Sequence, residues 1–536
     1  MSAASLTADY VVVGAGSAGA ALAARLSEDP RISVLLLEAG GPDKALELHV
    51  PAAFSRLFRG PYDWNYDTVP QPQLEGRTVY WPRGKSLGGS SSLNAMMWIR
   101  GFAADYDEWA EVAGDRWGWD ALVPYFRRVE RTADPADPTQ GTDGPQAVAH
   151  QRDPRPHTTA FLAAARQAGH EVTPPNLPAK QGFSQTMVTQ HRGARASTAD
   201  AYLRPARRRR NLRVVTNAHV RRLTFDGARA TGAYVDIAGI TRKVTATREV
   251  ILAGGAINTP QLLMLSGIGP ADHLAEHGIP VRVDAPSVGS NLQDHLVAGL
   301  APGAHGGTLY GAERRAELVR YLAGRRGMLS SNVAEGYGFV RTDVADRSGT
   351  PADLPDIEII FAAAPYVGEG LVPLPAEGLT VGAILLRPHS RGTIRLASAD
   401  PHAHPLIDPA YLSDADGLDL ETMRAGLRAC LELLRTPALR AVTNGWVQPA
   451  DADRMSDEEL VEVSIRRYAH TLYHPVGTAR MGTDPESVVD PELRVRGVEG
   501  LRVADASVIP SLIRGHTNAP AIVIGEVAAD LLRDAR

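Results

Sequence analysis

The start of the chain alternates short apolar runs with a glycine-rich turn. Residues 10–13 are continuously apolar and have the length of a buried strand. A Gly-Ala-Gly-Ser-Ala-Gly turn follows, and residues 20–26 then have the composition of a helix. A second apolar run covers residues 32–37. This pattern predicts a buried parallel strand, a tight turn, a helix and a second parallel strand.

The glycine turn has the spacing of a dinucleotide-binding site. Gly14 permits the tight turn, Gly16 lets the backbone approach a pyrophosphate, and Gly19 lets the helix pack closely on the strand. The helix N-terminus offers its unpaired N–H groups to the phosphates. Glu38, directly after the second apolar run, can bind an adenosine ribose 2′-hydroxyl and would repel a 2′-phosphate. The pattern predicts a Rossmann-like α/β domain for NAD or FAD, which share this spacing.

A different pattern fills the middle of the chain. Residues 336–340, 357–361 and 393–396 alternate in a way that is typical of antiparallel strands, and residues 419–434 predict a helix. We expect them to form a substrate domain with an antiparallel sheet flanked by helices, which makes the chain α+β overall. Residues 131–157 are rich in Pro, Asp and Gly, and we expect a mobile surface loop or a lid there.

Composition sets limits on the class of protein. The chain has 536 residues and a formal charge of −5, enough for about two to four domains. Cys430 is the single cysteine, so no internal disulfide is possible, and no Cys/His cluster indicates a metal site. We interpret the arginines at 207–210 as a solvated surface, so nucleic acid is not an expected partner. Neither a signal peptide nor a transmembrane segment is expected, and the expected location is cytoplasmic.

Further motifs follow in order along the chain. They are GKSLGGSSSLN at 84–94, GAINTPQLLMLSGIG at 255–269, VGSNLQDH at 288–295, YHPVGTARMG at 473–482 and GHTNAP at 515–520. In the second motif we expect a helix with Thr259 as its N-cap and Pro260 in its first turn. Together the motifs resemble those of the glucose-methanol-choline (GMC) family of FAD-dependent oxidoreductases. Within that family the chain looks most like bacterial choline and aliphatic alcohol dehydrogenases.

The resemblance implies FAD as the cofactor and a fold woven from separate segments. The FAD-binding domain would comprise residues 1–155, 200–300 and 462–536. The substrate-binding domain would comprise residues 156–199 and 301–461.

The resemblance also implies a set of cofactor-binding residues. The set is Gly14, Gly16, Ser17, Ala18, Gly19, Glu38, Ala39, Trp64, Gly89, Ser90, Asn94, Ala95, Met96, Met97, Val220, Asp505, Ala506, Thr517 and Asn518. Some members of the family attach FAD covalently through a histidine in the loop after the paired glycines. Leu93 stands at that position here, so we expect the FAD to be non-covalent.

Two histidines in the C-terminal motifs, His474 and His516, are the candidate catalytic residues. Alcohol oxidation removes a hydroxyl proton and transfers a hydride to flavin N5, and a neutral imidazole can accept that proton. We expect His474 to be the base and His516 to orient the hydroxyl, while the reverse assignment stays open. The similar alcohol dehydrogenases have asparagine at the position of His516.

The function that the resemblance implies is oxidation of a primary alcohol to its aldehyde, with the chain acting as a dehydrogenase. The expected partners are a small-molecule alcohol and an electron acceptor, namely oxygen, a quinone or another carrier. An oxygen-using oxidase of the same family, acting on a sugar, an amino-sugar or another hydroxymethyl group, stays open as an alternative. A more distant alternative is a hydroxynitrile lyase, which keeps FAD and uses the histidine pair on a cyanohydrin.

Overall fold

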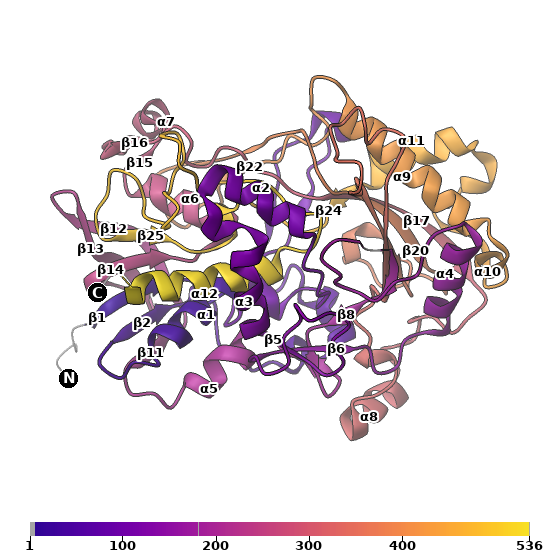
Figure 1. The fold of residues 1–536 in the computed structure, drawn as a ribbon, viewed down its shortest axis with the longest axis horizontal. Coiled ribbons are helices and arrows are strands. Elements are labelled where there is room, and N and C mark those ends of the chain that lie inside the picture. The colour runs from indigo at the N-terminus through magenta and orange to yellow at the C-terminus, as the bar shows by residue number, and fades with distance from the viewer. Residues whose placement is uncertain (1–5, 181, 535–536) are drawn as a thin grey trace.

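The fold is built on two sheets that lie side by side in the computed structural model, which describes residues 6–180 and 182–534 (Figure 1). In the first sheet, β1 (Leu6–Val13) lies between β2 (Val34–Leu37) and β14 (Ile240–Leu252). β11 (Leu212–Val215) pairs with β2, and β25 (Leu501–Val503) pairs with β14. All of these pairings are parallel. Segments from the start, the middle and the end of the chain therefore share one sheet.

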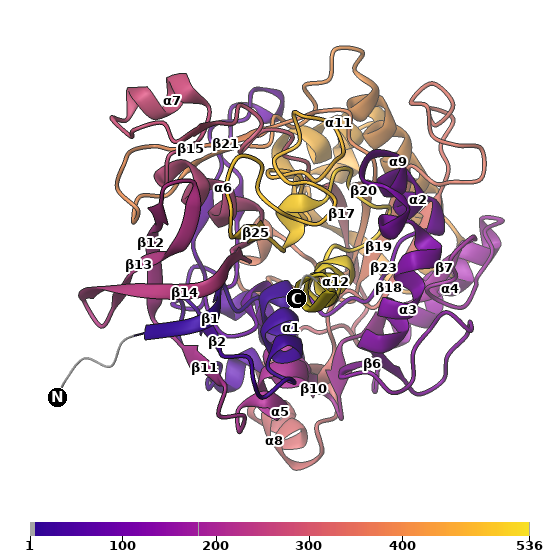
Figure 2. The same cartoon turned by 60° about the vertical axis from the view of Figure 1, so that its left-hand side comes forward.

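The predicted strand, turn, helix and strand at the start of the chain are confirmed. The helix α1 (Ser17–Leu26) begins directly after the glycine turn. It packs against the C-terminal helix α12 (Asn518–Asp534), and the two lie side by side in Figure 2. A Cβ atom on Gly525 would lie 2.3 Å from the Ala18 carbonyl oxygen, so this close approach of the helices requires glycine.

The helix after β14 differs from its prediction. α6 spans Gly255–Leu265, so Pro260 lies inside the helix and Thr259 is not its N-cap. Proline cannot donate the hydrogen bond that the Ala256 carbonyl would normally receive. The Thr478 hydroxyl donates to that carbonyl instead, at 2.6 Å, which makes an internal proline tolerable.

The second sheet is antiparallel, as the alternating pattern predicts. Its strand order is β23 (Thr443–Gln448), β17 (Leu296–Ala304), β20 (Thr380–Leu385), β19 (Ile357–Ala362), β18 (Gly336–Val340) and β7 (Phe183–Gln185), with β24 (His470–Thr471) also paired to β17. The predicted helix is confirmed as α9 (Leu418–Leu434), which packs on this sheet beside α4 (Pro156–Gln167) and α11 (Asp457–Tyr468). The predicted strand at 393–396 forms as β21 (Thr393–Arg395), but it pairs with β22 (Leu406–Asp408) outside this sheet.

Other elements surround the two sheets. β13 (Arg229–Ile237) and β12 (Ala218–Asp226) extend the first sheet beyond β14 with antiparallel pairings. The strands outside the two sheets include β3 (Tyr66–Asp67), β4 (Tyr80–Trp81), β5 (Glu130–Thr132), β6 (Gln146–His150), β8 (Met187–Val188), β9 (Gln190–His191), β10 (Ala194–Arg195), β15 (Ile268–Gly269) and β16 (Val283–Asp284). The further α-helices are α2 (Ala103–Ala113), α3 (Trp119–Val129), α5 (Arg204–Ala206), α7 (Ala271–Glu276), α8 (Arg315–Gly324) and α10 (Pro437–Arg440). No helix within residues 6–180 and 182–534 combines the length and the apolar character needed to cross a bilayer.

Strands occupy parts of two segments whose limits were predicted from the sequence. β6 lies inside the predicted loop at 131–157 and pairs with β5 and β8, so this part of the segment is sheet and not a lid. β17 crosses the predicted domain boundary at 300, and β24 also joins the second sheet. We propose that the substrate domain begins its second segment at Leu296 and extends to Thr471.

Candidate active site

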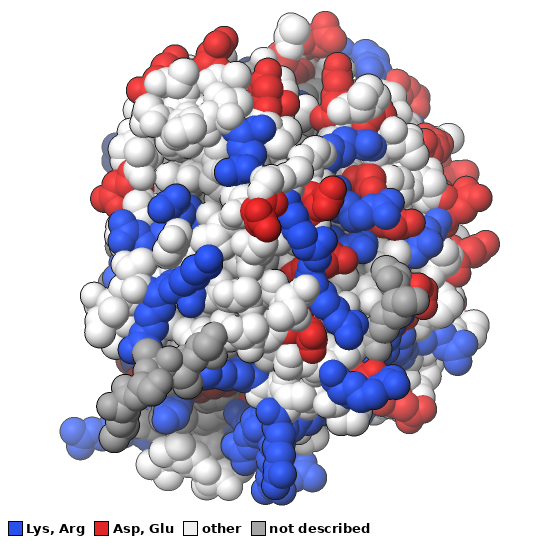
Figure 3. Space-filling model, turned by 90° about the vertical axis from the view of Figure 1, so that its left-hand side faces the viewer, with Lys and Arg blue, Asp and Glu red and all other residues white. Residues whose placement is uncertain are grey.

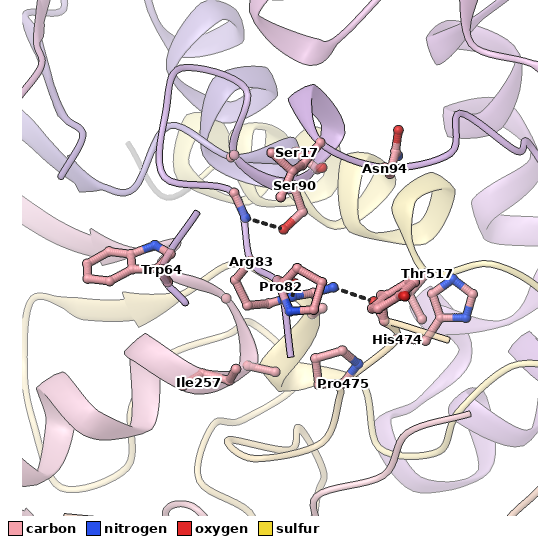
Figure 4. Close-up of a pocket in the computed structure, with 18 of the residues that line it drawn as sticks. Ser17, Trp64, Pro82, Arg83, Ser90, Asn94, Ile257, His474, Pro475 and Thr517 are labelled. Carbon is pink, nitrogen blue, oxygen red and sulfur yellow. Dashed lines mark hydrogen bonds between the residues drawn. The ribbon is translucent and has the colours of Figure 1, made fainter. Parts of the chain in front are cut away.

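A single cavity runs between the two sheets and collects nearly all the candidate residues. Its wall includes every predicted cofactor-binding residue except Gly19, and it includes both His474 and His516 (Figure 4). Gly19 acts from behind the wall, because a Cβ atom there would lie 2.0 Å from the Gly14 carbonyl oxygen. A side chain larger than hydrogen would therefore not fit between the helix and the turn that follows β1.

The glycine turn leaves an open anion site at the start of α1. Gly14 has a φ of +104°, and a Cβ atom there would lie 2.3 Å from the Ala253 carbonyl oxygen. A Cβ atom on Gly16 would instead meet nothing closer than the Gly89 Cα atom, at 3.9 Å. Gly16 is the N-cap residue and gives α1 no side-chain cap. The first N–H groups of the helix are thus left for a ligand, which fits a pyrophosphate.

Glu38 lies at the adenosine end predicted for the cavity. Its carboxylate accepts hydrogen bonds from the backbone N–H groups of Ala15, at 2.9 Å, and Gly40, at 2.8 Å. Burial raises the pKa of Glu38 and these two hydrogen bonds partly offset that rise, so that the resulting pKa is about 7. Trp64 lines the same end, with the Lys85 ammonium 4.4 Å from its ring centroid.

The middle of the cavity presents an oriented amide. The Asn94 side-chain oxygen accepts from the guanidinium of Arg195, at 2.8 Å, and from the Met96 N–H, at 3.0 Å. This leaves the Asn94 amide N–H groups to donate to a ligand. Arg195 is buried, and burial lowers its pKa to about 9.

Asp505 joins the end of the chain to α6. Its carboxylate accepts from the Gly255 N–H at 2.8 Å, from the Thr259 hydroxyl at 2.6 Å and from the Ser507 N–H at 2.8 Å. Thr259, expected as a helix cap, therefore fixes a cavity-lining carboxylate. Burial raises the pKa of Asp505 above its usual range.

The two candidate histidines are neighbours at the second sheet. Their ring centroids lie 4.6 Å apart, and the rings are 8% and 6% exposed for His474 and His516. His516 Nε2 lies 3.2 Å and 3.3 Å from the two carboxylate oxygens of Glu358. Burial, followed by the electrostatic influence of the neighbouring His516, His295 and Arg83, holds the pKa of His474 well below its usual range. His474 is therefore a neutral imidazole near pH 7 and can accept a proton.

The backbone that presents His474 is held on both sides. Tyr473 adopts a φ of +71°, which is unfavourable for a tyrosine. Arg83 donates to the Tyr473 carbonyl at 2.7 Å (Figure 4). The Tyr473 and Tyr366 hydroxyls are 2.7 Å apart. The backbone N–H of His474 donates to the Asp294 carboxylate at 2.7 Å. These contacts fix where the imidazole enters the cavity.

Comparison with known proteins identifies the family. Residues 8–297 and residues 388–525 match the N-terminal and C-terminal family models described as GMC oxidoreductase. The chain belongs to the GMC oxidoreductase family. An uncharacterized GMC-type oxidoreductase of Mycobacterium tuberculosis is 55% identical, over 98% of this chain and 99% of that protein.

A named relative and a solved structure also cover almost the whole length. An alcohol dehydrogenase [acceptor] of Pseudomonas putida is 41% identical, over 98% of this chain and 95% of that protein. A formate oxidase variant of Aspergillus oryzae RIB40, solved in a study of FAD modification, is 31% identical with a TM-score of 0.90. That comparison covers 99% of both chains.

In this GMC oxidoreductase, the cavity wall on the side of the second sheet is mostly apolar and aromatic, with Thr380, Gln448 and His470 as polar members. This part of the wall comes from the second sheet and the nearby loops, and includes Phe54, Phe58, Val297, Ile360, Tyr366, Leu472 and Tyr473. Among the described residues, the acidic ones that line the cavity are Glu38 and Asp505, both at the cofactor side. The aromatic wall, which the sequence did not locate, favours an uncharged apolar or aromatic substrate.

Several residues that shape the site escaped sequence reasoning. Glu358 and His295 contact the histidine pair, and Arg195 orients Asn94, yet none of them was a candidate. One signal was present for Glu358, since it is an acid inside an otherwise apolar strand at 357–361. His295 belongs to the VGSNLQDH motif at 288–295, whose residues suggest no role for it by themselves.

Proposed function

We propose that this GMC oxidoreductase oxidises uncharged primary alcohols to aldehydes, with His474 as the base. The observation that carries the proposal is the neutral, buried His474 beside His516, at the junction of the glycine-lined half and the apolar half of one cavity. The cofactor is FAD, and the family and the cavity both support it. The same proposal places the enzyme in the cytoplasm.

The residues that would hold FAD follow from the chemistry of the wall. The α1 N-terminus at Gly16 suits the pyrophosphate, Glu38 suits the adenosine ribose, and the Asn94 amide suits a hydrogen-bond acceptor on the flavin. When bound, FAD supplies a two-electron acceptor for the hydride that leaves the alcohol carbon. Leu93 lines the cavity and has no nucleophilic atom, which supports non-covalent binding.

The protein residues handle the hydroxyl group. His474 accepts the hydroxyl proton, which makes departure of the hydride from the same carbon favourable. His516 has its Nε2 atom on the Glu358 carboxylate. Because His474 takes the single hydroxyl proton, the His516 Nδ1 atom would hold the substrate oxygen only as an N–H donor, with Glu358 balancing the charge of the doubly protonated ring. The Glu358 carboxylate also compensates the positive charge that arises when His474 takes the proton. The apolar wall excludes water from the reacting groups.

A flavin experiment tests the proposal. The purified protein should show a flavin spectrum that bleaches without oxygen on addition of primary alcohols such as hexanol or benzyl alcohol. His474→Ala should keep the flavin but reduce it about 10²- to 10⁴-fold more slowly. Acid precipitation should release the flavin into the supernatant. A protein without flavin, or a His474→Ala variant as fast as wild type, would contradict the proposal.

The electron acceptor is part of the same proposal. We propose a dehydrogenase, supported by the 41% identity to an alcohol dehydrogenase [acceptor]. Turnover with a dye or quinone acceptor should exceed turnover with oxygen. The opposite order would indicate the oxidase alternative, and cyanide release from a cyanohydrin without flavin reduction would indicate the lyase.

A further inference from the structure

His295 lies behind the catalytic pair and touches His474 directly. It directly precedes β17 and is fully buried, and it does not line the cavity among the described residues. Its Nδ1 atom lies 2.9 Å from His474 Nδ1, and its Nε2 atom lies 3.1 Å from the Leu386 carbonyl oxygen. The three groups form a chain that leads from the backbone to the base.

The chain of contacts determines where the protons sit. A carbonyl oxygen can only accept, so the Nε2 atom of His295 must carry a proton. A neutral His295 then has a bare Nδ1 atom, which can only accept from His474. Burial lowers the pKa of His295 to about 3, which agrees with a neutral ring. His474 must therefore carry its proton on Nδ1, and its Nε2 atom is left with a free lone pair.

We propose that His295 is a positioning residue that fixes His474 in the Nδ1–H tautomer and so makes Nε2 the proton acceptor in alcohol oxidation. This inference rests on the proposed function. The Leu386 carbonyl sets the direction of both hydrogen bonds of His295, because a backbone carbonyl oxygen can only accept. A His474 ring without this partner could take either tautomer, and only one of them presents a lone pair to the substrate.

Paired variants of His295 test this role in the FAD-loaded enzyme. Gln can still accept from His474 and donate to the Leu386 carbonyl, whereas Leu can do neither. We expect His295→Leu to lower the rate constant of anaerobic flavin reduction about 10- to 100-fold, with the apparent substrate Kd unchanged. His295→Gln should recover most of that loss. Equal rates for His295→Leu and wild type would overturn the inference, whereas a wild type that no alcohol reduces would overturn the proposed function.

A spectroscopic measurement on the wild type does not depend on the folding of any variant. In protein labelled with ¹⁵N-histidine, the signals of His474 are those that disappear in His474→Asn. We expect them to show a protonated Nδ1 and a bare Nε2. A protonated Nε2 in the resting enzyme would overturn the inference, even if His295→Leu proved unstable.

The helix α8 projects from the body of the molecule at the bottom of Figures 1 and 2. Arg315, Leu318, Val319 and Leu322 share one face of this helix at i, i+3, i+4 and i+7 spacing. Val319 and Leu322 are 65% and 60% exposed. The side that faces the protein carries Tyr321, whose hydroxyl donates to the His49 carbonyl at 3.2 Å. The helix thus presents its apolar face outward.

Basic side chains surround this apolar face. Residues 311–327, which contain α8, hold five arginines against two glutamates. Residues 204–213, which include α5, hold six arginines and no acid. α5 lies at the same lower end as α8 in Figures 1 and 2, and Figure 3 shows basic side chains gathered at the bottom of the adjoining face. This concentration is local, since the whole chain has a formal charge of −5.

We infer that α8 and residues 204–213 seat the protein on an anionic phospholipid surface. Leu318, Val319 and Leu322 would enter the boundary between headgroups and acyl chains, and the arginines would contact the lipid phosphates. A convex ridge with an apolar crest and basic flanks suits a flat anionic surface better than a concave protein partner. This inference is independent of the reaction that the enzyme catalyses.

Vesicle sedimentation tests this surface. The holoenzyme should bind phosphatidylcholine vesicles containing phosphatidylglycerol about tenfold more than pure phosphatidylcholine vesicles. The combined change Leu318→Ser, Val319→Ser and Leu322→Ser should abolish binding, as should Arg207→Glu with Arg208→Glu. The control, Ile240→Ser with Leu406→Ser, alters side chains that are 57% and 47% exposed elsewhere and should bind as wild type. Absence of vesicle binding, or a wild-type dimer that the α8 change dissociates, would overturn the inference.

Discussion

Glu358 holds His516 through both of its carboxylate oxygens, at 3.2 Å and 3.3 Å from the Nε2 atom. The carboxylate is fully buried in β19, and His516 comes from a loop 158 residues further along the chain. Burying a carboxyl group in a strand is costly unless it is hydrogen-bonded, so its contact with His516 must matter to the protein. We interpret the Glu358 carboxylate as the counter-charge for the histidine pair.

Replacing Glu358 by Gln should therefore slow chemistry more than it weakens binding. The variant keeps the size of the side chain but loses the charge that compensates a protonated His474. We expect the rate constant of anaerobic flavin reduction to fall about 10- to 100-fold, with flavin content unchanged.

Glu335→Gln is a matched control for this change. Glu335 is also buried and accepts hydrogen bonds from Thr158 and from the Arg155 N–H, both at 2.6 Å, and it does not line the cavity among the described residues. Glu335→Gln should lower the stability of the fold and leave the rate constant of anaerobic flavin reduction unchanged. Equal rate losses in both variants would show that the effect of Glu358→Gln is structural.

The lowered pKa of His474 predicts the pH dependence of the reaction. Only the neutral ring accepts a proton, so activity is lost as pH falls through the pKa of His474. Because that pKa lies well below 6.5, flavin reduction at about pH 6 should stay within about twofold of its rate at about pH 8. The groups that face the ring are His516, His295 and Arg83.

Asp294 provides a control for the pH profile. Burial raises the pKa of Asp294 to about 6, and its carboxylate accepts a hydrogen bond from the backbone N–H of His474. An acid limb near pH 6 that disappears in Asp294→Asn would belong to Asp294. A limb at or above pH 6.5 that persists in that variant would contradict the assignment of a lowered pKa to His474.

Two glycines of the same turn should respond differently to alanine. A Cβ atom on Gly19 would lie 2.0 Å from the Gly14 carbonyl oxygen, so Gly19→Ala should destabilise the fold by at least about 3 kcal/mol. A Cβ atom on Gly16 meets open space, so Gly16→Ala should cost about 1 kcal/mol or less but lower FAD content. Thermal unfolding of the apoprotein and flavin absorbance separate the two effects. Normal FAD content in Gly16→Ala would argue against a phosphate at this position.

The sequence predicted what depends on neighbouring residues and missed what depends on pairing across the fold. The glycine turn is local, and the spacing of its glycines is enough to predict a turn that is directly followed by a helix. The start of α6 was mispredicted at Pro260, because the hydroxyl of Thr478, far along the chain, donates to the Ala256 carbonyl in place of the missing backbone N–H. Glu358 contacts His516 across 158 residues of sequence, and His295 contacts His474 across 179. Their positions depend on the antiparallel register of the second sheet, which no local pattern specifies.

The aromatic wall predicts how substrate preference can be changed. Phe58 lines the cavity, and its ring centroid lies 6.0 Å from that of Tyr473, the residue that precedes His474. Phe58→Ala should lower kcat/KM for hexanol and benzyl alcohol about 10- to 100-fold and affect ethanol little, because only the longer substrates reach the lost surface. Phe225→Ala is the control, since Phe225 lies outside the cavity lining and packs beside Arg282. If Phe58→Ala lowers kcat/KM equally for ethanol and hexanol, Phe58 supports the loop of the histidine and does not contact substrate.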